Sequence, residues 1–290
     1  MKFSSMHTHT TFCDGKDDVE TMCRAAYEKK LFSIGFSAHA PVLRQLGTES
    51  DWHMREERMG EYVEQVIAAK ERWRGKLEVF LGLEVDYIKG LRSPLDSDIR
   101  AINPDYLIGA VHYVIPHNGT ELFTVDAPLD EFEEGFTRGF NRDGDAIMHC
   151  YYDAVAEMIA MGGFDILAHA DIIKKNCQNK NYWTNESEFI RQKEIAQAIA
   201  AKNIVAEVNT GGLNRKKTSD TYPSLPFLRY FYEYNVPVTI TSDAHNAKDI
   251  DGNYDNAIKT LICAGFSQHF IFFGKNHWKK EIIQNSVNIG

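Results

Sequence analysis

The sequence has no excess of basic residues. Lysine and arginine together number 32 against 41 aspartates and glutamates, which gives a formal net charge of -9. An acidic surface argues against nonspecific binding of nucleic acid and against an anionic membrane as partner. It does not exclude a small anionic substrate, because bound divalent cations can reverse the local electric field.

Long apolar runs and paired cysteines are also missing. No window is apolar enough to span a bilayer, and the amino terminus has no basic segment followed by an apolar run. The five cysteines are odd in number, scattered and without a CxxC pair, which argues against a disulfide framework and for free thiols in a reducing compartment. We therefore expect a soluble, cytoplasmic protein, with a homodimer left open as its assembly state.

Linkers rich in proline, glycine or serine and low-complexity tracts are absent as well, which predicts one domain over residues 1–290. The composition, 43% hydrophobic and 25% charged, is that of an ordinary globular protein. Short β-branched or aromatic runs alternate with segments of helical periodicity, the α/β pattern of βα units around a parallel sheet. After a first strand that ends in the two histidines His7 and His9, the predicted strands are 33–37, 77–83, 106–111, 165–168, 204–208 and 237–241.

Potential metal ligands follow almost every predicted strand. In a closed barrel of parallel strands the carboxyl ends meet at one rim, where barrel enzymes have their active sites. On an extended backbone His7 and His9 project to the same face, and Asp14 follows in the next loop. The nine candidates are His7, His9, Asp14, His39, Glu84, His112, His169, Asp243 and His245.

Nine nitrogen and oxygen donors are too many for a single ion, because zinc takes about four protein ligands. They suit two or three divalent ions that share a bridging carboxylate. Imidazole together with carboxylate favours Zn, with Mn or Fe as alternatives, over Mg or Ca. We interpret the remaining histidines as structural, since a single histidine is more often hydrogen-bonded than metal-bound; they are His53, His117, His149, His269 and His277.

Residues 113–144 form the least regular stretch of the sequence. Aromatic and acidic side chains are scattered along it, among them Tyr113, Phe123, Asp126, Glu133 and Glu134. An insertion after a strand of a βα architecture lies on the active-site face, so this segment is our candidate for a lid or specificity loop. A surface elaboration with its own small apolar cluster is the alternative.

The motifs at the strand ends are His7-Thr8-His9, Ser37-Ala38-His39-Ala40-Pro41, Gly82-Leu83-Glu84, Val111-His112, Ala168-His169 and Ser242-Asp243-Ala244-His245. Nearly end to end, they resemble the successive motifs of the polymerase-and-histidinol-phosphatase (PHP) family. Within that family the chain is most similar to the histidinol-phosphate phosphatases. The features that point there are Phe12-Cys13-Asp14-Gly15, Gly109-Ala110-Val111-His112-Tyr113 and Glu207-Val208-Asn209-Thr210-Gly211-Gly212-Leu213, with Asp14 at a place that is often histidine in other branches.

The resemblance implies a distorted seven-stranded (β/α) barrel, similar to a TIM barrel, with a trinuclear metal centre. One ion would be held by His7, His9, Glu84 and Asp243. Glu84 would bridge to a second ion, which His112 and His169 also bind. The third would be held by Asp14, His39 and His245.

The phosphatase branch implies hydrolysis of L-histidinol phosphate to L-histidinol and phosphate, a step of histidine biosynthesis. Our hypothesis is direct attack by a metal-bound hydroxide, with Glu84, Asp14 and Asp243 as the catalytic carboxylates of the metal centre. Arg215 follows the glycines after the sixth strand and is our candidate for contacting the substrate phosphate, because a guanidinium matches phosphate bidentately. The neighbouring lysines leave a solvated basic patch as the alternative for Arg215.

Other functions stay open at this stage. The chain could be another PHP phosphoesterase, either a phosphoprotein phosphatase or a nuclease, but a nuclease should show a basic, aromatic-lined track for the strand. A noncatalytic metal-binding module would have lost ligands, and none is missing from the sequence. An amidohydrolase-type barrel also begins with His-x-His, but it usually needs a metal-bridging lysine, whereas here Glu84 offers the bridge.

Overall fold

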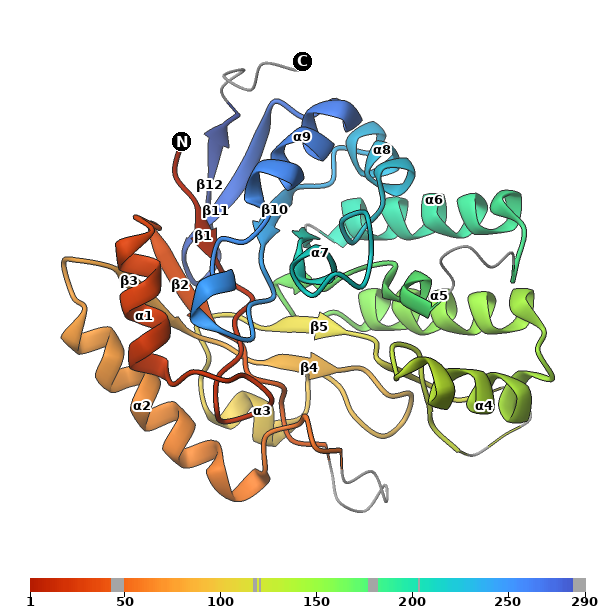
Figure 1. Ribbon diagram of the computed structural model, residues 1–290, viewed down its shortest axis with the longest axis horizontal. Helices are drawn as coiled ribbons and strands as arrows, with labels where there is room; N and C mark the ends of the chain where they lie inside the picture. Colours follow the sequence, from red (N-terminus) through yellow and green to blue (C-terminus); the bar gives the residue numbers. More distant parts are fainter. Residues whose placement is uncertain (43–49, 117–118, 120, 177–181, 203, 284–290) are drawn as a thin grey trace.

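Two parallel sheets form the interior of the molecule (Figure 1). The computed structural model describes residues 1–290 apart from 43–49, 117–118, 120, 177–181, 203 and 284–290. The strand orders are β1-β2-β3 in one sheet and β10-β9-β8-β5-β4 in the other. Their bounds are β1 Ser4–Ser5, β2 Ser33–Phe36, β3 Glu78–Leu81, β4 Glu84–Asp86, β5 Ile108–Ala110, β8 Ile166–Leu167, β9 Val205–Asn209 and β10 Val238–Thr241.

Isolated bridges join the edges of the two sheets. Thr8 pairs with Ala244 at the ends of β1 and β10, and His39 pairs with Glu84 beyond β2. The strands therefore follow one another around a ring in which β3 and β4 are two pieces of the predicted third strand. The predicted α/β fold with a distorted seven-stranded barrel is confirmed, although the ladders do not close into one continuous sheet.

The break between β3 and β4 lies at Gly82, where the strand passes the ring of Tyr106. A Cβ atom on Gly82 would lie 2.5 Å from that ring, which is too close for any other residue to fit. The hydroxyl of Tyr62, in α2 (Met59–Arg72), donates a 2.8 Å hydrogen bond to the Gly82 carbonyl. That carbonyl is therefore bonded to a helix side chain, and the strand is interrupted where the sequence pattern predicts continuity.

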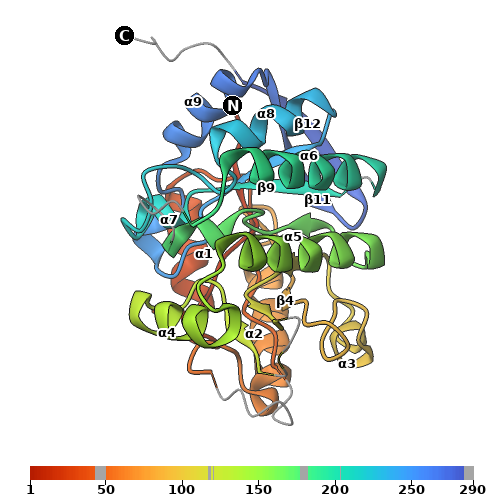
Figure 2. The ribbon, with the colours of Figure 1, turned by 90° about the vertical axis from the view of Figure 1, so that its right-hand side faces the viewer.

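Helices cover the outside of the strand ring (Figure 1). α1 begins after Asp18, whose side chain accepts a 2.7 Å hydrogen bond from the Thr21 amide. α5 and α6 pack side by side, as the turned view shows (Figure 2). Within the described part of the chain, no helix is both long and apolar enough to cross a membrane. The bounds are α1 Val19–Glu28, α3 Ser97–Ala101, α5 Gly144–Met161, α6 Asn185–Lys202, α7 Gly211–Asn214, α8 Leu225–Glu233 and α9 Tyr254–Ala264, with 3-10 turns at Glu56–Arg58, Ile172–Asn176 and Ala247–Asp249.

The segment 113–144 is more regular than its sequence suggests. It contains the two-stranded hairpin of β6 (Tyr113–Val114) and β7 (Phe123–Thr124), followed by α4 (Leu129–Phe140). Phe132, Phe136 and Phe140 recur every four residues and are buried, which explains the helix. The expectation of an irregular stretch was wrong on this point. Its role as a lid or specificity loop stays a prediction.

A hairpin of β11 (Gln268–Gly274) and β12 (His277–Ile282) closes the interior at the end opposite the predicted ligands (Figure 1). Its Phe272 is fully buried and contacts the rings of Phe80 and Tyr106 at centroid distances of 4.8 and 5.4 Å. The Tyr106 hydroxyl donates a 2.6 Å hydrogen bond to the Met6 carbonyl. We call this cluster the aromatic plug; its members are Met6, Phe80, Tyr106, Ile108, Ile166 and Phe272.

Candidate metal centre

The first two candidate ligands are directed by backbone pairing at the end of β1. The His9 amide donates a 2.9 Å hydrogen bond to the Ala244 carbonyl, and the Ala244 amide donates one of 3.2 Å to the His7 carbonyl. Thr8 lies between them, and its amide donates to the Ser37 hydroxyl at 2.9 Å. Because alternate side chains of an extended chain share a face, His7 and His9 both project inward, with ring centroids 5.1 Å apart.

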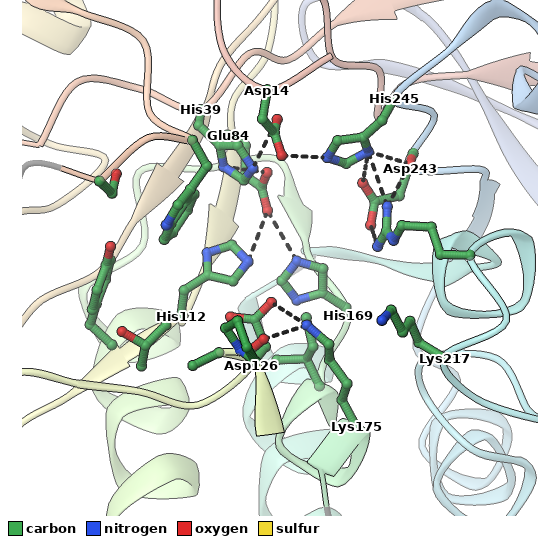
Figure 3. A pocket seen from close by; sticks show the side chains of 18 of the residues that line it. Asp14, His39, Glu84, His112, Asp126, His169, Lys175, Lys217, Asp243 and His245 are labelled. Atoms are coloured by element: carbon green, nitrogen blue, oxygen red, sulfur yellow. Dashed lines mark hydrogen bonds and ion pairs between the residues drawn. The ribbon is translucent and has the colours of Figure 1, made fainter. Parts of the chain in front are cut away.

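Glu84 contacts candidate ligands on both sides, and Figure 3 shows it among His39, His112 and His169. Its Oε2 is 3.1 Å from His7 Nε2 and 3.0 Å from His39 Nδ1. Its Oε1 is 3.0 Å from His169 Nε2 and 3.7 Å from His112 Nε2. The two carboxylate oxygens therefore face two different sets of imidazoles, which is the arrangement that a carboxylate shared by two ions requires.

A second set of contacts between carboxylates and imidazoles lies beside Glu84, around Asp14. Its Oδ2 is 3.0 Å from His245 Nε2, and its Oδ1 is 3.9 Å from His39 Nε2. Asp243 Oδ1 lies 3.3 Å from His9 Nε2 and 3.4 Å from His245 Nδ1. All nine predicted ligands therefore lie in one contiguous cluster beyond the carboxyl ends of the strands.

The donor atoms can be grouped around possible ions by their mutual distances. Three sets have ligand atoms within 4.8 Å of one another: His9 with Asp14, His39 and His245; His7 with His9 and Asp243; and His39 with Glu84 and His112. These sets overlap at His9 and His39, and they differ in part from the division that the family resemblance implies. His169 belongs to none of them, although it contacts Glu84 directly.

Buried polar atoms without partners indicate that the cluster suits metal ions. His7 Nε2, His9 Nε2, His39 Nδ1 and Glu84 Oε2 are buried, and no hydrogen bond reaches them within the described part of the chain. They lie within ion-pair distance of one another or of Asp243, and a buried polar atom that forms no hydrogen bond costs about 1–3 kcal/mol. Four such atoms facing one another are accounted for if cations bind between them, and nitrogen with carboxylate oxygen is the donor set of Zn, Mn or Fe. The residues therefore fit the predicted ions.

The electrostatics of the cluster keep its carboxylates ionised. Burial alone would raise the pKa of Glu84, but the neighbouring His39 and His7 hold it well below its ordinary value. Burial likewise opposes ionisation of Asp243, whose pKa is nevertheless held well below the ordinary value by Arg215 and His7. Burial, together with His245 and His39, lowers the pKa of His9 to about 3. Burial and the two neighbouring imidazoles therefore favour the neutral form of His9, whereas the facing carboxylates raise the pKa of His7 and His39.

Glu207 in β9 is a functional candidate that the sequence analysis did not select. Its Oε2 is 2.8 Å from His7 Nδ1 and accepts a 2.8 Å hydrogen bond from the Thr241 hydroxyl. Its Oε1 accepts a 2.7 Å hydrogen bond from the His169 amide. Glu207 thus fixes the orientation of one candidate ligand and the backbone of another. An acid inside an otherwise apolar strand was the signal that could have identified it.

Asp86 plays the same part for His112 and was also missed. Its Oδ1 is 2.7 Å from His112 Nδ1, and its Oδ2 is 2.7 Å from His53 Nε2. Glu84 and Asp86 are two residues apart on β4, so period-two alternation could have placed both on the inner face. His53, expected to be structural, is a hydrogen-bonded neighbour of the cluster.

Arg215 is held against Asp243. Its Nη2 donates a 2.9 Å hydrogen bond to Asp243 Oδ2, and its Nη1 donates one of 3.2 Å to the Asp243 carbonyl. Asp243 has a left-handed backbone with a φ of 48°, which is costly for a residue other than glycine. Gly211 makes room for this pair, because a Cβ there would lie 2.6 Å from Asp243 Oδ2. Arg215 also lines the cavity, so it can face a bound anion while holding Asp243.

A cavity of about 670 Å³ opens from the cluster. Of the five aromatic and acidic side chains named from the segment 113–144, Tyr113 and Asp126 line it. The other three are not among its lining residues: Phe123 is buried in the apolar core, and Glu133 and Glu134 pair with Arg142 and Arg138. Trp52, Lys175 and Lys217 also line it, and Lys175 is bonded to Asp126.

Comparison with known proteins gives the family of the chain. The PHP domain family matches residues 5–211. A "Probable histidinol-phosphatase" from Deinococcus radiodurans is 27% identical over 260 residues, which are 89% of this chain and 92% of that protein.

Two solved structures share the fold. A Listeria monocytogenes protein assigned as a histidinol phosphatase superposes with a TM-score of 0.77 at 20% identity, covering 87% of this chain and 99% of that one. The histidinol phosphate phosphatase of Lactococcus lactis, in complex with zinc, L-histidinol and phosphate, gives a TM-score of 0.66 at 17% identity and covers 96% of this chain and 99% of that one. Since the match to the family spans more than half of the sequence, the chain belongs to the PHP domain family, as its motifs predict.

Proposed function

We propose that this protein is a metal-dependent phosphomonoesterase that hydrolyses L-histidinol phosphate to L-histidinol and phosphate. The observation that carries the proposal is the largely buried cluster of nine imidazole and carboxylate side chains around Glu84, open to a cavity that can take a small phosphate ester. The relative from Deinococcus radiodurans supports the substrate, because it bears this function in its name and matches nearly the full length of the chain.

The nine side chains would hold two or three divalent ions, with zinc favoured by the donor set and by the zinc of the Lactococcus lactis protein. Bound ions act as Lewis acids that neutralise charge on the phosphoryl oxygens and make water a better nucleophile. The residues of the chain prepare this chemistry. Glu84 joins the two sets of imidazoles, while Glu207 and Asp86 orient His7 and His112.

Arg215 adds a protein cation to the site. Its guanidinium lines the cavity and is fixed by Asp243, so it faces the substrate without first having to be ordered. Lys217 also lines the cavity and supplies a second positive charge. In this proposal Arg215 contacts the nonbridging oxygens of the substrate phosphate bidentately. The acids of the cluster, Asp14, Glu84 and Asp243, would serve as ligands of the bound ions.

Metal analysis combined with a substrate panel tests the function. Purified protein would be assayed for metal content by elemental analysis and for phosphate release from L-histidinol phosphate, p-nitrophenyl phosphate, sugar phosphates and a phosphodiester. We expect kcat/KM for L-histidinol phosphate to exceed the other monoesters by at least ~100-fold, equivalent to about 2.7 kcal/mol. The preference arises because polar groups of the site that pair with L-histidinol phosphate are left without partners when an analogue binds.

Each outcome of the panel separates this proposal from another function. Similar rates on all monoesters would reject the histidinol phosphate assignment and leave a general phosphatase. Faster cleavage of the phosphodiester would favour a nuclease. Bound metal without hydrolysis of any member would favour a noncatalytic metal-binding module.

A further inference from the structure

Three aromatic rings stack at one side of the cavity. The ring centroids of Trp52 and His53 are 3.8 Å apart with planes at 29°, and those of Trp52 and Tyr113 are 5.5 Å apart with planes at 14°. Trp52 and Tyr113 line the cavity, whereas His53 lies behind them and is bonded to Asp86. We call Trp52 and Tyr113 the aromatic wall.

The aromatic wall begins where the candidate metal centre ends. The Trp52 ring meets the His39 ring edge to face at a centroid distance of 4.7 Å, and the His112 ring at 5.2 Å. In L-histidinol phosphate, five bonds of about 1.5 Å separate the phosphorus from the imidazole, so the two ends lie about 6 Å apart at full extension. A phosphate held at the metal centre therefore brings the imidazole within reach of Trp52.

The charges of the cavity favour the same orientation of the substrate, with its phosphate at the metal centre and its imidazole at the aromatic wall. The cations Arg215 and Lys217 belong to the chain after β9, and Lys217 lies across the cavity from His112 in Figure 3. The aromatic wall adjoins Asp51 and His112 in the sequence. The third cation that lines the cavity, Lys175, is paired with Asp126 at 3.3 Å. A substrate that carries its negative charge at one end and a cationic head at the other is oriented by this polarity.

We propose that Trp52, supported by Tyr113, stacks on the imidazole ring of the substrate and so determines the choice of phosphomonoester; this inference rests on the proposed function. An indole face is the best aromatic surface for a planar cation, and stacking of a heterocycle on it gains further contact. The hydrogen bond of His53 to Asp86 holds the ring behind Trp52 in place, so little ordering is needed when the substrate arrives.

A purely structural role for Trp52 makes a different prediction. If Trp52 only packs against His39 and His112, its removal should disturb the metal centre and slow every substrate alike. A role in recognising the ring should affect only substrates that have a ring. O-phosphoethanolamine is the matched probe, because it keeps the phosphate ester and the ammonium of L-histidinol phosphate and lacks the imidazole.

The experiment compares both substrates in Trp52→Ala, Trp52→Phe and the unmodified protein, with metal content measured in each. Trp52→Ala should lower kcat/KM for L-histidinol phosphate by ~10- to 100-fold, the range that loss of one stacked heterocycle gives. Its rate on O-phosphoethanolamine should stay within about threefold, and Trp52→Phe should fall between. Trp73→Phe is the control, since Trp73 packs on Tyr27 and is not a cavity-lining residue.

The outcomes distinguish the two proposals. If the unmodified protein does not prefer L-histidinol phosphate to O-phosphoethanolamine, the proposed function itself fails. If it does, and Trp52→Ala retains the preference with full metal content, the aromatic wall does not recognise the ring. Equal losses on both substrates together with lost metal would assign Trp52 to packing of the metal centre and overturn the inference.

Discussion

The two ends of the strand ring differ in chemistry although the same strands build both. The third predicted strand carries Phe80 in the aromatic plug and Glu84 in the candidate metal centre. The next carries Ile108 in the plug and, four residues later, His112 in the centre. Since alternate residues of a strand share a face, the plug residue and the ligand of each of these two strands belong to one inward-facing series of side chains. In these two strands the apolar residue of the plug and the ligating residue of the centre are four residues apart.

The two ends also differ in how their buried polar atoms are paired, which separates the part that stabilises the fold from the part that binds ions. In the plug the one inward polar group, the Tyr106 hydroxyl, is bonded to a carbonyl. In the metal centre several ring nitrogens and a carboxylate oxygen are buried without hydrogen-bond partners in the described structure. Packing at the plug stabilises the fold, while the unpaired atoms at the centre cost free energy until they are ligated. Ions that bind only the folded protein should therefore stabilise it.

The largest effect is expected at the centre of the cluster. Glu84→Gln should lower kcat/KM by at least ~1000-fold, about 4 kcal/mol, and should also reduce metal content, because the carboxylate faces two sets of imidazoles at once. Kinetics and elemental analysis of the same sample measure both. Glu78→Gln, at the exposed start of β3, is the control. Full metal content in Glu84→Gln would mean that Glu84 is not a shared ligand.

A substitution in the aromatic plug should lower the stability of the protein without lowering its catalytic activity. Phe272→Ala should lower the free energy of unfolding by about 3–5 kcal/mol, because it leaves a cavity among fully buried rings. Chemical denaturation measures this loss, and the turnover of the folded fraction should stay within about threefold. Phe189→Ala, on an exposed part of α6, should cost far less. A large drop in turnover at full folding would show that the two ends are coupled.

A buried histidine beside the plug should make the stability of this end of the molecule depend on pH. His269 in β11 is 1% exposed, and burial lowers its pKa from 6.5 to about 4. Because the unfolded chain takes up this proton below pH 6.5 and the folded chain only near pH 4, stability should fall as the pH falls through that window, by about 2–3 kcal/mol. His269→Leu should remove this contribution, measured as the difference in unfolding free energy from the unmodified protein between pH 7 and pH 4. His277→Gln, on the exposed face of the same hairpin, should leave the pH dependence of stability unchanged.

The sequence predicts the ligating end of the ring better than the rest. His7, His39 and Glu84 follow recognisable strands, and parallel strands bring their ends together, so the candidate ligands could be named without coordinates. The sequence pattern does not reveal the strand break at Gly82, because the break depends on the ring of Tyr106 in the predicted strand 106–111. The partners of Glu207 and Asp86 are likewise remote in sequence, and the stacking of Trp52 on Tyr113 joins the loop before α2 to strand β6. Such contacts depend on packing, which periodicity does not encode.

The smallest effect is expected one step outside the cluster, where Glu207 orients a candidate ligand without belonging to any candidate ligand set. Glu207→Gln keeps the size of the side chain but removes the charge beside His7 Nδ1, so the ring should hold an ion less firmly. We expect metal affinity to fall by ~10- to 100-fold, the usual result of changing an outer partner of a ligating histidine. Titration with a competing chelator measures the affinity, and excess zinc should restore most of the activity. Glu188→Gln, a hydrogen-bonded acid on α6, is the matched control. A loss that excess zinc does not restore would assign Glu207 to the chemistry rather than to ligand positioning, and the division between ligating and supporting acids would have to be redrawn.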